Sequence, residues 1–243
     1  DVVSPLDGSQ SVTVNTVNAD ATTTTNTEAT QSDVVTTNVN EDNGSIVIRT
    51  EAGGLTLNEG TATDDLDGDA AVVAHGSGNI LLSVEGVGTS ITANANADVE
   101  STTGHVTMSA TQSITLNGSV DVTTGGTGTM DLAAATGSLV MDATATLNTV
   151  NGDIRLTVGD EVLDQVILGD LTASNANVSI ETPGSVLDTA DADNEVSALG
   201  LRVVAGKGFG LLAGNSLLLP VNAIETAVTT VSILVRGSDG VNV

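Results

Sequence analysis

The stretch that decides the fold is TGHVTMSATQSITLNGSVDVTT, residues 103–124. It holds three short runs in which apolar residues alternate with polar or small ones: Val106 and Met108, Ile114 and Leu116, and Val120 and Val122. Alternation with a period of two puts one side of each run inward and the other outward, as in a β-strand. A helix would instead repeat its apolar residues at every third or fourth position. The stretch therefore predicts three short β-strands.

The same plan returns at regular intervals along the chain. A glycine-x-apolar-x-apolar motif opens the first run of each unit at Gly44, Gly78, Gly104, Gly128 and Gly152. Ala176 replaces the glycine in the next unit, and at Gly200 the alternation slips by one residue. The second run is often opened by a serine, at Ser90, Ser113, Ser138, Ser185 and Ser216. The third run centres on Val99, Val122, Leu147, Leu171 and Val196, and the units settle to a step of 24 residues.

Three short strands in a repeating unit of this length are typical of a β-solenoid, in which one unit forms one coil. Equivalent strands of successive coils then pair in parallel, about 4.8 Å apart. A β-sandwich and a β-propeller are the alternatives, but both use longer strands, and propeller blades take about 40 residues. Phe209 is the only aromatic residue, which fits a thin interior filled by aliphatic side chains. We predict an all-β fold, a right-handed parallel β-helix (β-solenoid) with three short strands per coil of about 24 residues.

The repeats also predict the domain organisation. Residues 1–43 are Thr-rich and weakly apolar, and we expect an N-terminal coil, cap or linker there. Residues 44–243 are predicted to form the β-solenoid repeats as a single elongated domain. Neither end carries an amphipathic helix of the kind that caps stand-alone solenoids. We therefore expect end-to-end self-association or continuation in a longer chain.

Charge narrows the classes of partner. The chain carries 31 Asp and Glu against 5 Lys and Arg, a net charge of −26. Such a surface repels nucleic acid and anionic membranes and favours a cation-rich setting. There is no cysteine, which excludes disulfides and thiolate metal sites. The sequence contains no run of 18 apolar residues, so membrane insertion is not predicted.

Two acidic clusters are the candidate metal sites. The first contains Asp64, Asp65, Asp67 and Asp69, and the second contains Asp188, Asp191, Asp193 and Glu195. Carboxylates at alternate positions match the first half of a Ca²⁺ loop, although Ala70 and Gly76 depart from its second half. Both clusters fall between the second and third runs of their units, so they are expected along one edge of the rod. The prediction is Ca²⁺ binding, and the alternative is a pair of solvated acidic turns.

The repeats resemble those of filamentous haemagglutinin-type adhesins and related giant bacterial surface proteins. The most similar piece is residues 199–243, where a glycine-rich run leads into the sequence Asn222-Ala-Ile-Glu-Thr-Ala-Val228. The resemblance implies a secreted, right-handed β-helical rod at the cell surface that adheres to a cell-surface or matrix ligand, or builds matrix. With five basic residues, a Lys/Arg-rich polysaccharide-binding groove is not expected here.

Three classes of function follow. The favoured one is a non-enzymatic structural or adhesive segment of an extracellular fibre or matrix protein. The second is a subunit that polymerises end to end into an extracellular filament. The third is a β-helical polysaccharide-cleaving enzyme, which would need clustered carboxylates with a basic residue and usually aromatic platforms for sugar rings. Two carboxylates and an arginine in one groove would favour that third class, whereas His75 and His105 are expected to be surface or turn residues.

Overall fold

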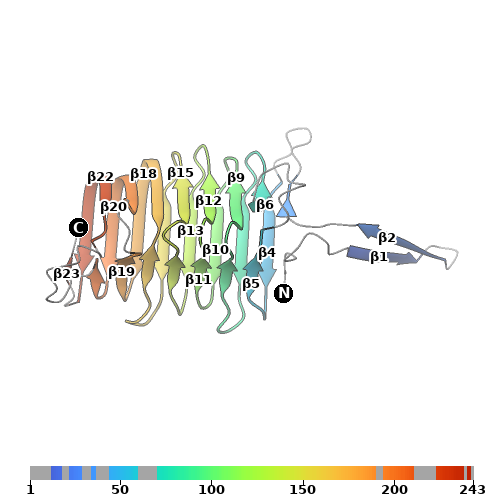
Figure 1. Ribbon diagram of the computed structural model, residues 1–243, viewed down its shortest axis with the longest axis horizontal. Helices are drawn as coiled ribbons and strands as arrows, with labels where there is room; N and C mark the ends of the chain where they lie inside the picture. Colours follow the sequence, from blue (N-terminus) through green and yellow to red (C-terminus); the bar gives the residue numbers. More distant parts are fainter. Residues whose placement is uncertain are drawn as a thin grey trace.

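The alternating runs form the strands of a parallel β-solenoid, shown as a computed structural model in Figure 1. The structure describes residues 12–17, 22–28, 34–36, 44–59, 70–189, 194–210, 223–237 and 240–241. These ranges contain strands and no helix, so they hold no helix long and apolar enough to cross a membrane. The all-β solenoid expected from the repeat is confirmed.

The coils before β18 (Asp170–Thr182) contribute one strand from each of the three runs. The first-run strands are β4 (Ile46–Thr50), β7 (Ile80–Val84), β10 (Val106–Ala110), β13 (Met130–Ala134) and β16 (Ile154–Val158). The second-run strands are β5 (Leu55–Leu57), β8 (Ile91–Ala93), β11 (Ile114–Leu116), β14 (Leu139–Met141), β17 (Val166–Leu168), β19 (Ser185–Asp188), β21 (Gly208–Phe209) and β23 (Gly240–Val241). The third-run strands are β3 (Val34–Val35), β6 (Ala70–Ala74), β9 (Asp98–Ser101), β12 (Asp121–Thr124) and β15 (Thr146–Thr149).

Strands of one run pair in parallel with their equivalents in the neighbouring coils. Val106 of β10, for example, pairs with Ile80 of β7 on one side and with Met130 of β13 on the other. The second-run strands form an 8-stranded sheet, and the first-run and third-run strands belong to a 13-stranded sheet. Figure 1 shows the strands side by side along the long axis, from β4 to β22.

The last coils depart from three separate strands. Here the third run of one coil continues into the first run of the next, and the fused strands are β18 (Asp170–Thr182), β20 (Val196–Ala205) and β22 (Thr226–Val235). The pairing of β18 with β20 is irregular between Ala173 and Asn177. Beyond it Asn177 pairs with Gly200 and Val178 with Leu201, which is the one-residue slip seen in the sequence.

The glycine of the repeated motif has a steric reason. The motif glycines stack directly on one another, so that a Cβ placed on Gly104 would lie 2.1 Å from Gly78 O. A Cβ on Gly152 would lie 1.6 Å from Gly128 O. No real Cβ contact is that short, and the obstructing atoms are backbone atoms that no rotamer change can move. Glycine is therefore the residue that lets consecutive coils reach strand spacing at this corner.

Buried hydroxyls satisfy the backbone at the same corner. Ser101 Oγ donates to Gly78 O at 2.7 Å and accepts the Gly104 amide at 2.8 Å. Thr124 Oγ1 donates to Gly104 O at 2.6 Å. These side chains are 3% exposed, so an unbonded carbonyl there would carry the full desolvation cost of a buried polar group. At these corners a hydroxyl at the end of one strand hydrogen-bonds the backbone of a motif glycine.

The inward positions form an aliphatic core that runs the length of the coils. Val106, Met108 and Ile154 have no exposed surface, whereas Thr107 between the first two is half-buried and points outward.

The serines that open the second run also stack. The Ser138 amide donates to Ser113 Oγ at 3.3 Å, and the Gln165 amide to Ser138 Oγ at 3.0 Å.

Two features lie in the N-terminal region predicted as coil, cap or linker. Strands β1 (Val12–Val17) and β2 (Thr23–Glu28) pair antiparallel. Strand β3 pairs in parallel with β6, so the third-run ladder includes residues that precede 44.

Candidate metal centre

One acidic residue occupies a core position of the second-run sheet. Asp188 ends β19 and pairs in the ladder with Leu168, which is fully buried. The equivalent residue of β11, Leu116, is also fully buried and pairs with Met141. Asp188 is only 7% exposed. The fold therefore places a carboxylate where earlier coils place an aliphatic side chain.

Two glutamates stack next to each other at the following corner. Glu195 directly precedes Val196 of β20, and Glu225 directly precedes Thr226 of β22. Val196 and Thr226 are partners in the parallel ladder, so the two glutamates hold the same position in successive coils. The Glu225 amide donates to Glu195 Oε2 at 2.6 Å.

These three side chains converge. One carboxylate oxygen each from Asp188, Glu195 and Glu225 lie within 4.8 Å of one another. Glu195 is 1% exposed, and Glu225 is partly buried. Glu195 Oε1 and Glu225 Oε2 are buried atoms with no hydrogen-bond partner in the part of the chain that the structure describes. We call these three residues the acidic triad.

Burial dominates the electrostatics of the triad. The pKa of Glu195 is raised to about 8, and burial is the largest cause. The neighbouring Asp188 and Glu225 charges also raise this pKa, whereas hydrogen bonds to backbone lower it. A buried carboxylate is costly as an anion unless a cation or a proton accompanies it. The acidic triad could hold a metal ion, and its donors are all hard oxygens.

The sequence found two of these residues and missed the third. Asp188 and Glu195 are predicted as ligands of one site, and the structure brings their carboxylates together between the second and third runs. The predicted ligands Asp191 and Asp193 lie outside the described residues, as does the whole first cluster of Asp64, Asp65, Asp67 and Asp69.

Glu225 was missed because its coil is longer than the 24-residue step of the central repeats. It follows Glu195 by 30 residues, whereas the prediction used a step of 24. A glutamate directly before the third run in both units, Glu195-Val196 and Glu225-Thr226, was the signal that would have found it.

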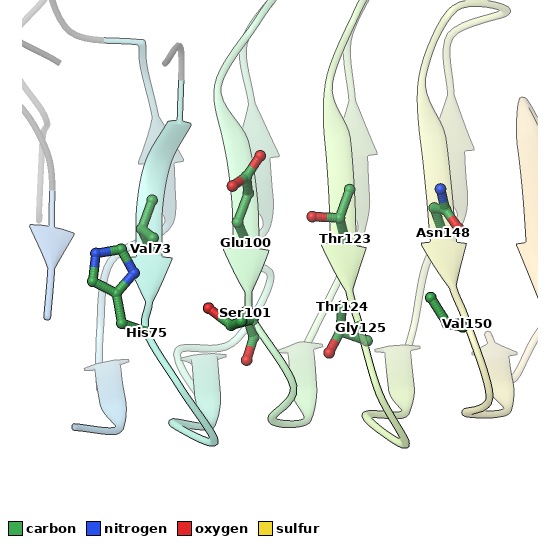
Figure 2. A pocket seen from close by; sticks show the side chains of 10 residues that line it. Val73, His75, Glu100, Ser101, Thr123, Thr124, Gly125, Asn148 and Val150 are labelled. Atoms are coloured by element: carbon green, nitrogen blue, oxygen red, sulfur yellow. The ribbon is translucent and has the colours of Figure 1, made fainter. Parts of the chain in front are cut away.

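A shallow groove is the second candidate site. It lies on the outward face of third-run strands β6, β9, β12 and β15 and has a volume of about 440 Å³. Figure 2 shows Glu100, Thr123 and Asn148 at the same height on successive strands, with His75 toward one end. Its lining thus includes one carboxylate and one imidazole, beside hydroxyl, amide and aliphatic groups.

The second histidine belongs to an outward column of polar side chains. His105 Nδ1 lies 2.8 Å from Thr129 Oγ1 and accepts the Thr129 amide at 3.1 Å. The His105 amide in turn donates to Asn79 Oδ1 at 2.8 Å. This arrangement bridges neighbouring coils and agrees with the expected surface position of His105.

Comparison with known protein families, with curated proteins and with solved structures finds no significant match to this chain. The parallel β-solenoid agrees with the β-helical repeat that the filamentous haemagglutinin-type resemblance implies. Membership of that family stays a prediction.

Proposed function

We propose that this chain is a non-enzymatic structural or adhesive segment of a secreted bacterial fibre or extracellular matrix protein, of the filamentous haemagglutinin type. The observation that carries the proposal is the unbroken parallel ladder from β4 to β22, which makes an elongated scaffold with repeated outward faces. Each coil contacts its neighbours and offers the same outward columns again. A rod of this kind suits display and adhesion to a cell-surface or matrix ligand better than a single-site activity.

The outward charge supports an extracellular setting rich in cations. A net charge of −26 on 24.0 kDa favours solubility and keeps neighbouring rods apart. On the first-run face, three of the five basic residues pair with acids of the adjacent coil, and one of these is Arg202, whose Nη1 lies 3.6 Å from Glu181 Oε2. Arg155 Nε donates to Asp131 Oδ1 at 2.9 Å, and both Arg49 nitrogens that contact Glu85 lie 2.5 Å from its carboxylate oxygens. We include Ca²⁺ among the ligands of the segment, and nucleic acid and membrane insertion are not part of the proposal.

The alternative is a filament that grows end to end. In the described part of the chain, β22 pairs only with β20, and its inward-column residue Val231 is 58% exposed. Leu234 on the same strand is 49% exposed. A backbone edge with apolar residues invites another coil, supplied either by the same polypeptide or by a second copy.

The enzyme class has weaker support. The groove on β6, β9, β12 and β15 offers Glu100 and His75 but a single carboxylate in its lining. Sugar-cleaving enzymes of the common kind place two carboxylates about the scissile bond. The lining therefore favours a non-enzymatic proposal.

An antibody against residues 44–243 tests the proposed role in the producing cells. We expect the antigen on intact cells or in the medium, detected by immunogold labelling and by protease treatment of unbroken cells. A polypeptide much larger than 24.0 kDa would mark a fibre segment, and a 24.0 kDa band in sedimentable filaments would mark a polymerising subunit. Antigen confined to the cytosol would refute both.

A further inference from the structure

We propose that the acidic triad of Asp188, Glu195 and Glu225 binds one Ca²⁺ ion. The ion links the coil that contains β19 to the next coil, in which Glu225 directly precedes β22. This inference deepens the Ca²⁺ part of the proposed function and does not depend on the fibre role. It differs from the sequence prediction in its ligands, because Glu225 enters from the next coil.

The first argument concerns two buried carboxylate oxygens, one on Glu195 and one on Glu225. Glu195 is 1% exposed, and its Oε1 has no hydrogen-bond partner among the described residues. Its other oxygen already accepts the Glu225 amide, so Oε1 is the atom left to coordinate an ion. Glu225 Oε2 is likewise buried without a hydrogen-bond partner. Uncompensated carboxylates of this kind are expelled from interiors unless a cation or proton joins them.

The second argument is the position of Asp188. A solenoid interior selects aliphatic residues at this ladder position, as Leu168 shows one coil earlier. An inward carboxylate gives up the apolar burial that a leucine would contribute. Coordination of a metal ion by the Asp188 carboxylate offsets this loss of apolar burial.

The third argument selects the ion. Two oxygens bound to one ion are separated by at most twice the bond length, which is roughly 4.6–5.2 Å for Ca²⁺ and about 4.2 Å for Mg²⁺. The three oxygens lie within 4.8 Å of one another, which is compatible with Ca²⁺. Three carboxylates also suit the flexible six- to eight-oxygen coordination of Ca²⁺ better than Mg²⁺, which demands near-ideal octahedral geometry and is usually bound through one or two carboxylates. Zinc is a poorer match, because its sites are built mainly from cysteine and histidine.

The bound ion would tie three points of the chain that are far apart in sequence. Asp188 ends a second-run strand, Glu195 precedes β20, and Glu225 precedes β22. Because β20 and β22 pair along their lengths, fixing their starting corner protects the whole C-terminal ladder. Ca²⁺ removal should therefore loosen β20 and β22 before the coils around β10 and β13.

The test uses the full 243-residue chain, freed of metal with a chelator, in CaCl₂, in MgCl₂ and in NaCl of matched ionic strength. Calorimetry measures binding, and hydrogen exchange measures protection in β20 and β22. At about 100 times Kd, a ligand of the folded state raises the folded-to-unfolded ratio roughly a hundredfold. We expect that gain with Ca²⁺, a smaller gain with MgCl₂, and added protection concentrated in β20 and β22.

The variants Glu195→Gln and Glu225→Gln keep shape and remove charge. We expect both to lose the Ca²⁺-dependent protection of β20 and β22, while their stability in chelator equals or exceeds that of the wild type. The exposed Glu161→Gln removes the same charge elsewhere and should keep the full Ca²⁺ response. Equal stability in CaCl₂ and matched NaCl, an equal or larger gain with MgCl₂, or Ca²⁺-dependent protection that survives in both variants would overturn the proposal. A variant already unstable in chelator would also count against it, because it would mean the carboxylate is structural without metal.

Discussion

The stacked glycines give the sharpest quantitative prediction, because the obstruction is measured in the structure. A Cβ on Gly152 would lie 1.6 Å from Gly128 O and 2.4 Å from Gly128 C. Both are backbone atoms, so the coils must separate by more than 1 Å to admit a methyl group. The adjacent ladder bond from the Met130 amide to Asp153 O is 3.0 Å long and would stretch beyond hydrogen-bond range.

Two effects set the size of the loss for Gly152→Ala. Overpacking a well-filled site costs about 1–3 kcal/mol, and each lost hydrogen bond costs about 1 kcal/mol. The expected loss in the free energy of unfolding is therefore about 2–4 kcal/mol. At about 2–4 °C per kcal/mol for a chain of this size, Tm should fall by roughly 5–15 °C.

Gly118→Ala is the matched control. Its Cβ would meet nothing closer than Thr144 Oγ1 at 3.4 Å and Asp142 Oδ1 at 3.5 Å, which are ordinary contacts. A tolerated glycine-to-alanine change stabilises by about 0.4–1 kcal/mol through the unfolded chain. Urea unfolding followed by far-UV circular dichroism, with calorimetry for Tm, measures both variants. If the two substitutions changed stability equally, or Gly152→Ala were neutral, the steric account of the repeated glycine would be wrong.

Three further predictions concern register, protonation and association. Ile154→Asp should lower the free energy of unfolding by more than about 4 kcal/mol in chemical denaturation, because a carboxylate replaces a fully buried side chain. The outward Thr107→Asp should lower it by about 1 kcal/mol or less. The reverse order would mean that the strand register is wrong by one residue. In chelator, the raised pKa of Glu195, about 8 against an ordinary 4.5, contributes stability that is complete below pH 4.5 and is lost as the pH rises through 8. Unfolding curves of the wild type and Glu195→Gln from pH 4 to 9 should therefore diverge as pH rises, and parallel curves would contradict this. Val231→Asp should abolish concentration-dependent association in light scattering, and a wild type that stays monomeric at high concentration would remove the end-to-end alternative.

The sequence predicted the parts of the fold that follow from periodicity. Alternation placed Val106 inward and Thr107 outward, and the repeat step placed Met130 beside Val106 in the next coil. It also located a glycine and a serine in most coils, although only the structure explains them. The glycine avoids a backbone clash, and a serine such as Ser113 accepts the amide of the next coil.

The fused strands of the last coils could not be read from periodicity. At Thr149 and Gly152 the corner holds both a hydroxyl and a glycine, and Thr149 Oγ1 donates to Gly152 O at 2.5 Å. In the next coil Ala173 and Ala176 stand at these positions. There the third run continues into the first run as the single strand β18. The sequence showed the substitution at 176, but periodicity does not indicate whether a corner separates two strands or is crossed by one.

Acidic residues at equivalent positions of successive coils lie about one strand spacing apart. At that distance two like charges repel by about 1 kcal/mol in water and by several times more in a buried site. On the outward faces, hydrogen-bond donors lie between the acidic residues of neighbouring coils. The Asp121 amide donates to Asp98 Oδ1 at 2.7 Å, and Thr146 Oγ1 donates to Asp121 Oδ1 at 2.6 Å. At another column Arg155 pairs with Asp131 of the preceding coil. These devices need no ion, and ordinary salt screens what repulsion remains.

The corner of Glu195 and Glu225 differs, because two glutamates follow one another in the ladder and Asp188 reaches the same point from the second run. The Glu225 amide is the donor that the structure supplies there, and it leaves Glu195 Oε1 without a partner among the described residues. Screening by monovalent salt acts weakly on a site that is 1% exposed, since mobile ions cannot approach it. Only a proton or a coordinated cation can neutralise it, and the two have opposite signatures. A proton stabilises the fold as pH falls, whereas Ca²⁺ binds the deprotonated triad and stabilises it as pH rises. The sign of the pH dependence in Ca²⁺ therefore distinguishes a metal site from a shared proton.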